Sequence, residues 1–150
     1  AALQLHLNLE AEADNIAVLG AWRARQGEGR RGIATTPIEH KAVIAAVHQA
    51  AREGADERFF EMSADGVVDS GSYDALVNDT TAIVSVMWVN NEIGTIQAIG
   101  ELAQKAKAVG ALFHTDAVQA FGKGDIDAKT IPFDFARSPR IHHCYELRRR

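Results

Sequence analysis

Cysteine is almost absent from this 150-residue chain, which contains only Cys144. A single cysteine excludes an internal disulfide and a zinc site made of cysteines, and it is typical of proteins in a reducing compartment. Long apolar runs are also missing, because no stretch approaches the roughly 20 residues that a membrane-spanning helix requires. Neither sign of charge dominates, since 16 basic residues stand against 20 acidic ones. We therefore expect neither a nucleic-acid nor a membrane partner.

The N-terminal segment, residues 1–9, lacks the basic region and the continuous apolar core of a signal peptide. Hydrophobic residues make up 47% of the chain and charged residues 24%, which is typical of a soluble globular protein about one domain long. These features together predict a cytoplasmic protein.

Segments with helical and strand-like character alternate along the chain. Apolar residues recur at helical spacing in residues 11–25, 39–53 and 99–109, and Ser72 is a suitable N-cap for a shorter helix through Val77. Apolar, β-prone segments occupy residues 33–36, 58–62, 80–89 and 111–115. This order predicts a three-layer α/β fold with a mainly parallel sheet and right-handed connections.

The C-terminal residues differ from the rest, because residues 136–150 follow neither the helical nor the strand period. We predict a partial domain over residues 1–135 and an irregular basic tail over residues 136–150. The sequence His142-His143-Cys144 lies in this tail. Its three side chains are too close together for a folded metal site, so we predict no bound metal.

Polar side chains follow two of the predicted strands. The first strand is followed by a run of amides and a carboxylate, and the second by a mixed polar group: Asn90, Asn91 and Glu92, then His114, Asp116 and Gln119. Because the carboxyl ends of neighbouring parallel strands meet at one edge of a sheet, these side chains are predicted to form a ligand crevice.

Each of these residues also has a purely structural interpretation. Asp116 suits a protonated ring nitrogen or a metal, but taken alone it better suits the cap of a short following helix. His114 fits either a ligand contact or a hydrogen-bonded core position. The loop of residues 90–92 either binds a ligand or only shapes a turn, for which Gly94 would supply the unusual backbone angle. His40 taken alone suits a surface position in the first turn of a helix.

Three short motifs occur in order along the chain: Glu39-His40-Lys41-Ala-Val43, Val89-Asn-Asn-Glu-Ile-Gly-Thr95 and His114-Thr-Asp-Ala-Val-Gln-Ala-Phe-Gly-Lys123. Together they resemble the cysteine desulfurases of the class V aminotransferase group, over roughly residues 13–133. The resemblance implies part of the large domain of the pyridoxal phosphate-dependent transferase fold. It also implies removal of sulfur from L-cysteine, which leaves alanine and an enzyme persulfide for iron–sulfur cluster or thio-cofactor assembly. The family forms homodimers and passes sulfur to acceptor proteins.

The resemblance implies four cofactor-binding residues. His40 would stack on the pyridine ring and move protons, which makes it the implied catalytic residue. Asp116 would keep the ring nitrogen protonated, and this interaction makes the cofactor an effective electron sink. Gln119 would hydrogen-bond the phenolic oxygen of the cofactor, and Asn91 would lie near that oxygen and the substrate carboxylate.

Two motifs of the family are altered in this chain. The family's Gly-Ala-Thr-Glu-like phosphate turn is replaced by Glu10-Ala11-Glu12-Ala13, in which an added carboxylate would repel phosphate. The Ser-x-His-Lys segment that supplies the Schiff-base lysine is replaced by Ser138-Pro-Arg-Ile-His-His-Cys144, with His142 roughly in the place of the lysine. Cys144 is not in the position of the persulfide cysteine. We therefore expect little or no desulfurase activity, and we expect the chain to be a truncated or frame-shifted reading of a longer gene.

Two alternatives stay open at the level of sequence. The first is a non-catalytic binding or interaction protein, and the second is another class V relative such as a selenocysteine lyase or an aminotransferase. A covalent bond between pyridoxal phosphate and some other lysine, such as Lys123, would favour an enzyme.

Overall fold

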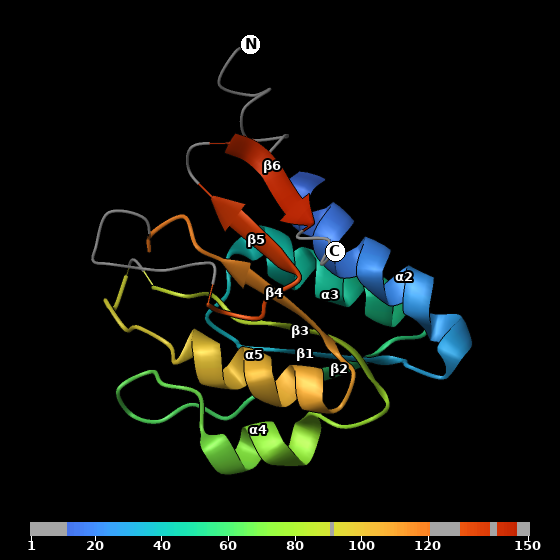
Figure 1. Cartoon of the computed structure of the whole chain (residues 1–150), viewed down its shortest axis with the longest axis horizontal. Coiled ribbons are helices and arrows are strands. Elements are labelled where there is room, and N and C mark those ends of the chain that lie inside the picture. The colour runs from blue at the N-terminus through green and yellow to red at the C-terminus, as the bar shows by residue number, and fades with distance from the viewer. Residues whose placement is uncertain (1–11, 91, 121–129, 139–140, 147–150) are drawn as a thin grey trace.

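The computed structural model describes residues 12–90, 92–120, 130–138 and 141–146. In this part of the chain, six strands form one sheet in the spatial order β2-β1-β3-β4-β5-β6 (Figure 1). The strands are β1 (Gly32–Thr35), β2 (Asp56–Phe59), β3 (Thr81–Ser85), β4 (Leu112–Asp116), β5 (Phe135–Ser138) and β6 (Ile141–Glu146). The strands β1 to β5 pair in parallel, whereas β6 is antiparallel to β5. The predicted α/β fold with a mainly parallel sheet is confirmed.

Helices cover both faces of the sheet (Figure 1). One face carries α3 (Lys41–Arg52) and an N-terminal helix that contains η1 (Ile16–Gly20) and α2 (Ala21–Arg25). The other face carries α4 (Ser70–Leu76) and α5 (Ile99–Ala108). A short turn, η2 (Gln26–Glu28), joins the N-terminal helix to the segment before β1. The sheet between two helical layers is the predicted three-layer arrangement.

Successive residues of the inner strands point to the two faces in turn. Ala34 of β1 and Val84 of β3 pack in the cluster under α4 and α5. Ile33 and Ile83 pack in the cluster under α3 and the N-terminal helix. Every residue of β1 and β3 is buried, because helices cover both faces, and this explains the mainly apolar character of residues 80–89.

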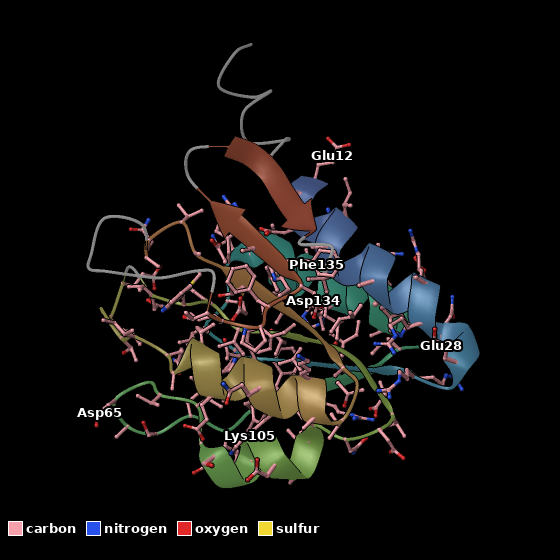
Figure 2. The ribbon with its side chains drawn as sticks, in the orientation of Figure 1. Glu12, Glu28, Asp65, Lys105, Asp134 and Phe135 are labelled. Carbon is pink, nitrogen blue, oxygen red and sulfur yellow. The ribbon has the colours of Figure 1, made fainter. Side chains whose placement is uncertain are left out.

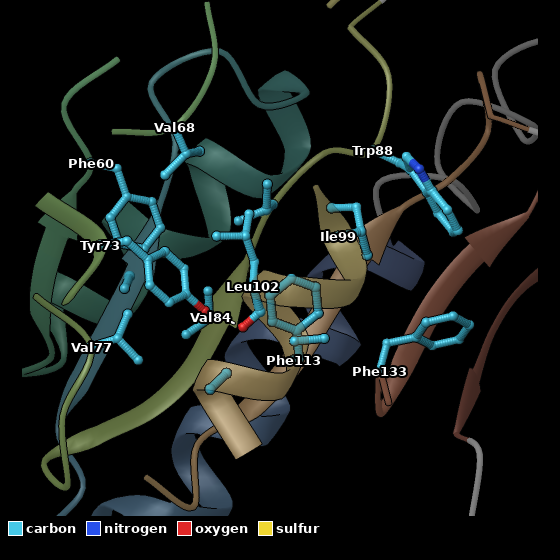
Figure 3. Close-up of a cluster of buried hydrophobic side chains, with 14 of the residues drawn as sticks. Phe60, Val68, Tyr73, Val77, Val84, Trp88, Ile99, Leu102, Phe113 and Phe133 are labelled. Carbon is cyan, nitrogen blue, oxygen red and sulfur yellow. Dashed lines mark hydrogen bonds between the residues drawn. The ribbon is translucent and has the colours of Figure 1, made fainter. Parts of the chain in front are cut away.

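Aromatic side chains fill the space between the sheet and the α4–α5 layer (Figure 3). The rings of Phe60 and Tyr73 stack with their centroids 4.9 Å apart. The Tyr73 hydroxyl donates a hydrogen bond of 2.6 Å to the carbonyl oxygen of Leu102, which ties α4 to α5. This bond satisfies a hydroxyl in a fully buried side chain. Charged residues such as Glu12, Glu28 and Asp65 lie at the periphery instead (Figure 2).

Trp22 anchors the N-terminal helix on the opposite face. Its side chain is buried in the same cluster as Val43 of α3, and its indole nitrogen donates to the carbonyl oxygen of Arg31 (3.1 Å). Ile16, one of the apolar residues at helical spacing in residues 11–25, does not face the sheet and is 65% exposed. The buried stripe of this helix consists instead of Ala13, Asp14, Ala17, Val18, Ala21 and Trp22.

Two further details differ from the sequence-based predictions. Asp69, and not Ser72, caps α4, because its Oδ1 accepts from the backbone N–H of Ser72 (2.7 Å). Moreover, β5 and β6 lie in a stretch whose residues beyond 135 were predicted to be irregular. These two strands form because β5 pairs with β4 and β6 pairs with β5. Backbone pairing of this kind leaves no side-chain period in the sequence. Within the described residues, no helix has the length and apolar character needed to cross a bilayer.

Candidate functional site

The carboxyl ends of four parallel strands, β1, β3, β4 and β5, lie at one edge of the sheet. The chain leaves β1 through α3 toward β2, while β3 lies on the other side of β1, so the connections diverge at this point. Open α/β sheets bind ligands at such divergence points. A pocket of about 560 Å³ lies here, lined by the loops that follow β1 and β3: Pro37, Ile38, Glu39, His40, Lys41, Met87, Asn90, Glu92 and Ile93. Its volume falls within the range of small-molecule sites.

Glu39 joins the two walls of this pocket. Its Oε1 accepts hydrogen bonds from the Thr36 hydroxyl (2.8 Å) and from the Met87 backbone N–H (2.5 Å). Burial raises the pKa of the carboxyl to about 8; the two hydrogen bonds oppose this rise, and the charges of Asp116 and Asp14 add to it. Because Oε1 accepts both bonds, the proton at pH 7 is on Oε2, which has no hydrogen-bond partner among the described residues. Glu39 thus brings a carboxylic acid, and not a carboxylate, to the pocket wall.

His40 is the N-cap of α3. Its Nδ1 accepts a hydrogen bond from the backbone N–H of Ala42 (3.2 Å), so in the neutral ring the proton lies on Nε2. The side chain is 46% exposed and lines the pocket. The structure therefore agrees with the predicted surface position at the start of a helix, and the ring is accessible to a ligand.

Asn90 shapes the loop after β3 and fastens it to the loop after β1. Its Oδ1 accepts from the backbone N–H groups of Glu92 (2.8 Å) and Ile93 (3.1 Å). Its Nδ2 donates to the carbonyl oxygen of Ile38 (3.1 Å). Gly94 has a φ of +73°, as predicted for this turn. Asn90 is therefore engaged in building the pocket mouth.

Asp116 ends β4 and is almost fully buried. Its Oδ1 accepts from the backbone N–H of Val118 (3.1 Å), so it is a cap, but residues 118–120 form a turn where the capping interpretation predicted a short helix. Its Oδ2 accepts from Nη1 of Arg137 (3.1 Å). The strand register places Arg137 of β5 directly beside Asp116 of β4, so the two side chains lie on the same face of the sheet.

Asp14 reaches the same guanidinium from the N-terminal helix. Its Oδ2 lies 3.1 Å from Arg137 Nη1 and 4.0 Å from Nδ1 of His40. Asp14, Asp116 and Arg137 are each less than 10% exposed, and we refer to these three residues as the ion cluster. Arginine keeps its charge at any ordinary pH, so it compensates the cost of burying carboxylates.

His114 lies beside the ion cluster in the core. The side chain is fully buried, and its Nδ1 is 2.8 Å from the Ser85 hydroxyl oxygen. Its Nε2 is 3.7 Å from Oδ1 of Asp14. Burial lowers the pKa of the imidazole to about 4; the charge of Asp116 opposes this shift and that of Arg137 adds to it. His114 is thus a neutral, hydrogen-bonded core histidine, which was one of its two predicted alternatives.

The structure brings two of the four predicted cofactor residues into one neighbourhood. The Asp14–Arg137 pair links them, because Asp14 Oδ2 lies 4.0 Å from Nδ1 of His40 and Arg137 Nη1 lies 3.1 Å from Oδ2 of Asp116. Gln119 is exposed in the turn after β4. Asn91 lies outside the described residues, as do the side chains of residues 142–144. The cofactor roles of all four residues stay predictions.

Sequence reasoning missed Asp14, Arg137 and the protonation of Glu39. Asp14 carries a signal that was overlooked, because it lies at helical spacing from buried Val18 and Ala21, and a carboxylate on such a stripe needs a partner. Arg137 offers no comparable signal, since only the pairing of β4 with β5 places it beside Asp116. The burial of Glu39 depends on Met87, which lies 48 residues further along the chain.

Pyridoxal phosphate, which the motifs imply, needs a carboxylate for its ring nitrogen and hydrogen-bond donors for its phosphate. The carboxylate of Asp116 is already engaged by Arg137 and by the Val118 backbone N–H. At the altered phosphate motif, Glu12 adds an exposed carboxylate. The residues as arranged therefore do not fit the cofactor, and we assign no chemical step to it.

Known proteins are similar to this chain in sequence and in fold. The aminotransferase class-V family model matches residues 10–139. The cysteine desulfurase IscS of Pseudomonas aeruginosa strain LESB58 is 41% identical over 123 residues, which make up 82% of this chain and 30% of that protein. DndA from Streptomyces lividans superposes with a TM-score of 0.77 at 37% identity, over 85% of this chain and 35% of that one. SspA in complex with cysteine superposes with a TM-score of 0.78 at 29% identity, over 86% of this chain and 37% of that one. The chain thus spans about a third of the length of the relatives that it matches.

Proposed function

We propose, because the chain belongs to the class-V aminotransferase family, that it corresponds to the pocket-forming part of a cysteine desulfurase cofactor domain. The observation that carries this proposal is the meeting of three desulfurase-like motifs at one edge of the sheet. His40 follows β1, Asn90 follows β3, and Asp116 ends β4. Sequence identity with IscS, and structural likeness to a protein solved with cysteine, support L-cysteine as the substrate of the complete protein.

In this proposal, the complete protein uses pyridoxal phosphate to remove sulfur from L-cysteine, and it leaves alanine and an enzyme persulfide. The sulfur would serve iron–sulfur cluster or thio-cofactor assembly through an acceptor protein, and the enzyme would act as a homodimer. His40 would contact the face of the cofactor ring, Gln119 and Asn91 its phenolic oxygen, and Asp116 its ring nitrogen. Each of these roles belongs to the complete site.

We infer further that this chain alone does not turn over L-cysteine. His142 stands roughly where the family has its Schiff-base lysine, and an imidazole cannot replace that amine. Cys144 is two residues away and does not occupy the persulfide position. In addition, Asp116 is held by Arg137. The lack of a nucleophilic amine at this place is sufficient to prevent the reaction.

The test uses the purified chain with added pyridoxal phosphate. Absorption spectra before and after borohydride, together with assays of alanine and sulfide from L-cysteine, separate binding from catalysis. We expect weak, reversible cofactor binding that a His40→Ala variant reduces, and no alanine. Release of alanine would overturn the inferred inactivity, whereas equal cofactor binding by wild type and a folded His40→Ala variant would overturn the proposed ring contact of His40.

A second candidate is a non-catalytic binding protein of the same family, and the Asp116–Arg137 pair favours it. A borohydride-stable cofactor adduct on another lysine, such as Lys123 or Lys41 at the pocket wall, would argue for an enzyme instead. Mass spectrometry of the reduced chain distinguishes the two lysines from each other and from an unmodified chain.

A further inference from the structure

We propose that Arg137 is a built-in competitor for ligands at Asp116, so that the site excludes cationic heteroaromatic rings as long as this guanidinium is in place. The inference rests on the proposed function, since it concerns the same carboxylate. Its starting point is the geometry of the ion cluster, in which Nη1 of Arg137 lies 3.1 Å from an oxygen of Asp116 and 3.1 Å from an oxygen of Asp14.

The backbone fixes the position of Arg137. The parallel register of β4 and β5 pairs it with Asp116, and the Ala117 backbone N–H donates to the Arg137 carbonyl oxygen (3.0 Å). The arginine is 7% exposed, and Asp14 is fully buried. The contact is therefore part of the interior and differs from a surface ion pair, whose two side chains separate at little cost.

A protonated ring nitrogen and a guanidinium compete for the same partner, because each donates a charge-assisted hydrogen bond to a carboxylate. The guanidinium cannot lose its proton, so a cationic ring that approaches Asp116 meets a like charge in a poorly solvated place. Asp14 strengthens this exclusion, since the arginine is held by a second carboxylate. A ring would have to displace Arg137 from a position that both carboxylates stabilise.

Removal of the guanidinium should open Asp116 to a ring nitrogen. We expect Arg137→Ala to bind pyridoxal phosphate at least about tenfold more tightly than the wild-type chain, as one gained hydrogen bond to a charged group generally provides. Equilibrium dialysis with absorbance detection gives both dissociation constants. The gain should vanish in Asp116→Asn/Arg137→Ala, and it should be absent for a carbocyclic analogue in which CH replaces the ring nitrogen.

When the wild-type chain or any variant binds the cofactor, a folded Arg137→Ala variant that binds it no more tightly than wild type would overturn the proposal. A gain that persists without Asp116, or with the carbocyclic analogue, would overturn it equally. Loss of Arg137 leaves two buried carboxylates without a compensating charge, which destabilises the fold. Each titration is therefore accompanied by a circular dichroism melt that shows whether the variant is folded. If Arg137→Ala does not fold, Asp14→Asn/Arg137→Gln provides the same test with one buried charge fewer, and the same gain is expected.

A second measurement needs no cofactor and therefore separates the two proposals. Methylguanidinium added to Arg137→Ala should re-enter between Asp14 and Asp116 and raise Tm more than the same concentration of tetramethylammonium. The rise should disappear when both aspartates are also changed to asparagine. Absence of this rescue in the folded variant would overturn the assignment of Arg137. Rescue in a chain of which no variant binds pyridoxal phosphate would support the Arg137 assignment and overturn the proposed function.

Discussion

The carboxyl ends of β1, β3, β4 and β5 form one edge of the sheet, and the two halves of this edge differ in the charge and exposure of their ionisable groups. The half between β1 and β3 is an accessible pocket whose wall contains half-exposed His40 and the neutral acid Glu39. The half between β4 and β5 is closed and contains the charged ion cluster. Burial near other carboxylates favours protonation of Glu39, whereas Asp14 and Asp116 have a guanidinium to compensate them. The same edge therefore has one wall with a buried neutral acid and another in which buried charges compensate each other.

The largest expected difference between the two halves is the pH dependence of the free energy of unfolding that Glu39 causes. Folding raises the pKa of its carboxyl from 4.5 to about 8, so this contribution to stability is complete below pH 4.5 and is lost as the pH rises to 8. The loss amounts to about 5 kcal/mol if the whole shift is expressed. Glu39→Gln cannot ionise and keeps the acceptor for Thr36 and Met87, so it should exceed wild type in stability at pH 8. Urea unfolding at a series of pH values measures the difference.

Glu61→Gln is the matched control, because Glu61 is exposed. Its stability curve should run parallel to that of wild type between pH 4.5 and 8. A Glu39→Gln curve that is also parallel would show that Glu39 ionises normally in the folded chain.

Loss of one acid from the ion cluster should have the next largest effect. Asp14→Ala removes a carboxylate that contacts Arg137 and leaves the buried guanidinium with fewer partners. Breaking a buried ion pair in this way typically lowers the free energy of unfolding by about 3–5 kcal/mol. Denaturant unfolding at pH 7 tests the value, with exposed Glu12→Ala of the same helix as the control. Equal, small changes in the free energy of unfolding of both variants would contradict the view that the ion cluster is buried and charged.

His114 should produce a smaller pH effect of opposite sign to that of Glu39. Folding lowers the pKa of its imidazole from 6.5 to about 4, so the stability that it contributes is present above pH 6.5 and is lost as the pH falls to 4. The loss is about 3 kcal/mol, and His114→Asn should not show it. Urea unfolding between pH 4 and 6.5 gives this difference. Nuclear magnetic resonance titration of the wild-type imidazole checks it directly, and a midpoint near 6.5 would contradict the burial described here.

The smallest effect is expected at His40, whose ring caps α3 through Nδ1. His40→Ala should lower the free energy of unfolding by about 1 kcal/mol, because the first turn loses a hydrogen-bond acceptor. His40→Asn should restore most of this loss, since asparagine is a good N-cap. Thermal melts compare the three chains. The asparagine variant also isolates the proposed ring contact, because it keeps the cap but should bind pyridoxal phosphate as weakly as His40→Ala.

The sequence was sufficient to predict the features that depend on local pattern. The helices near residues 39–53 and 99–109, the buried strand β3 and the turn glycine Gly94 all follow from period or residue type, whereas the pocket lies between the loops after β1 and β3 and is not lined by His114, Asp116 or Gln119. The pairing of Asp116 with Arg137 does not follow from period or residue type, because it depends on the register between β4 and β5. The protonation of Glu39 likewise depends on burial by residues that are distant in sequence. Local pattern thus located the edge, and long-range packing decided the charge of its groups.

Asn90 has a consequence for the motion of the pocket mouth. One amide side chain caps the turn after β3 and also holds the carbonyl oxygen of Ile38 across the opening. The two loops are thus tied by Asn90 as well as by the Glu39–Met87 hydrogen bond, and widening the mouth requires both contacts to break. In hydrogen exchange, the backbone amides of Glu92 and Ile93 should open together, because both donate to the same Asn90 oxygen, whereas the contact with Ile38 can break on its own through Nδ2.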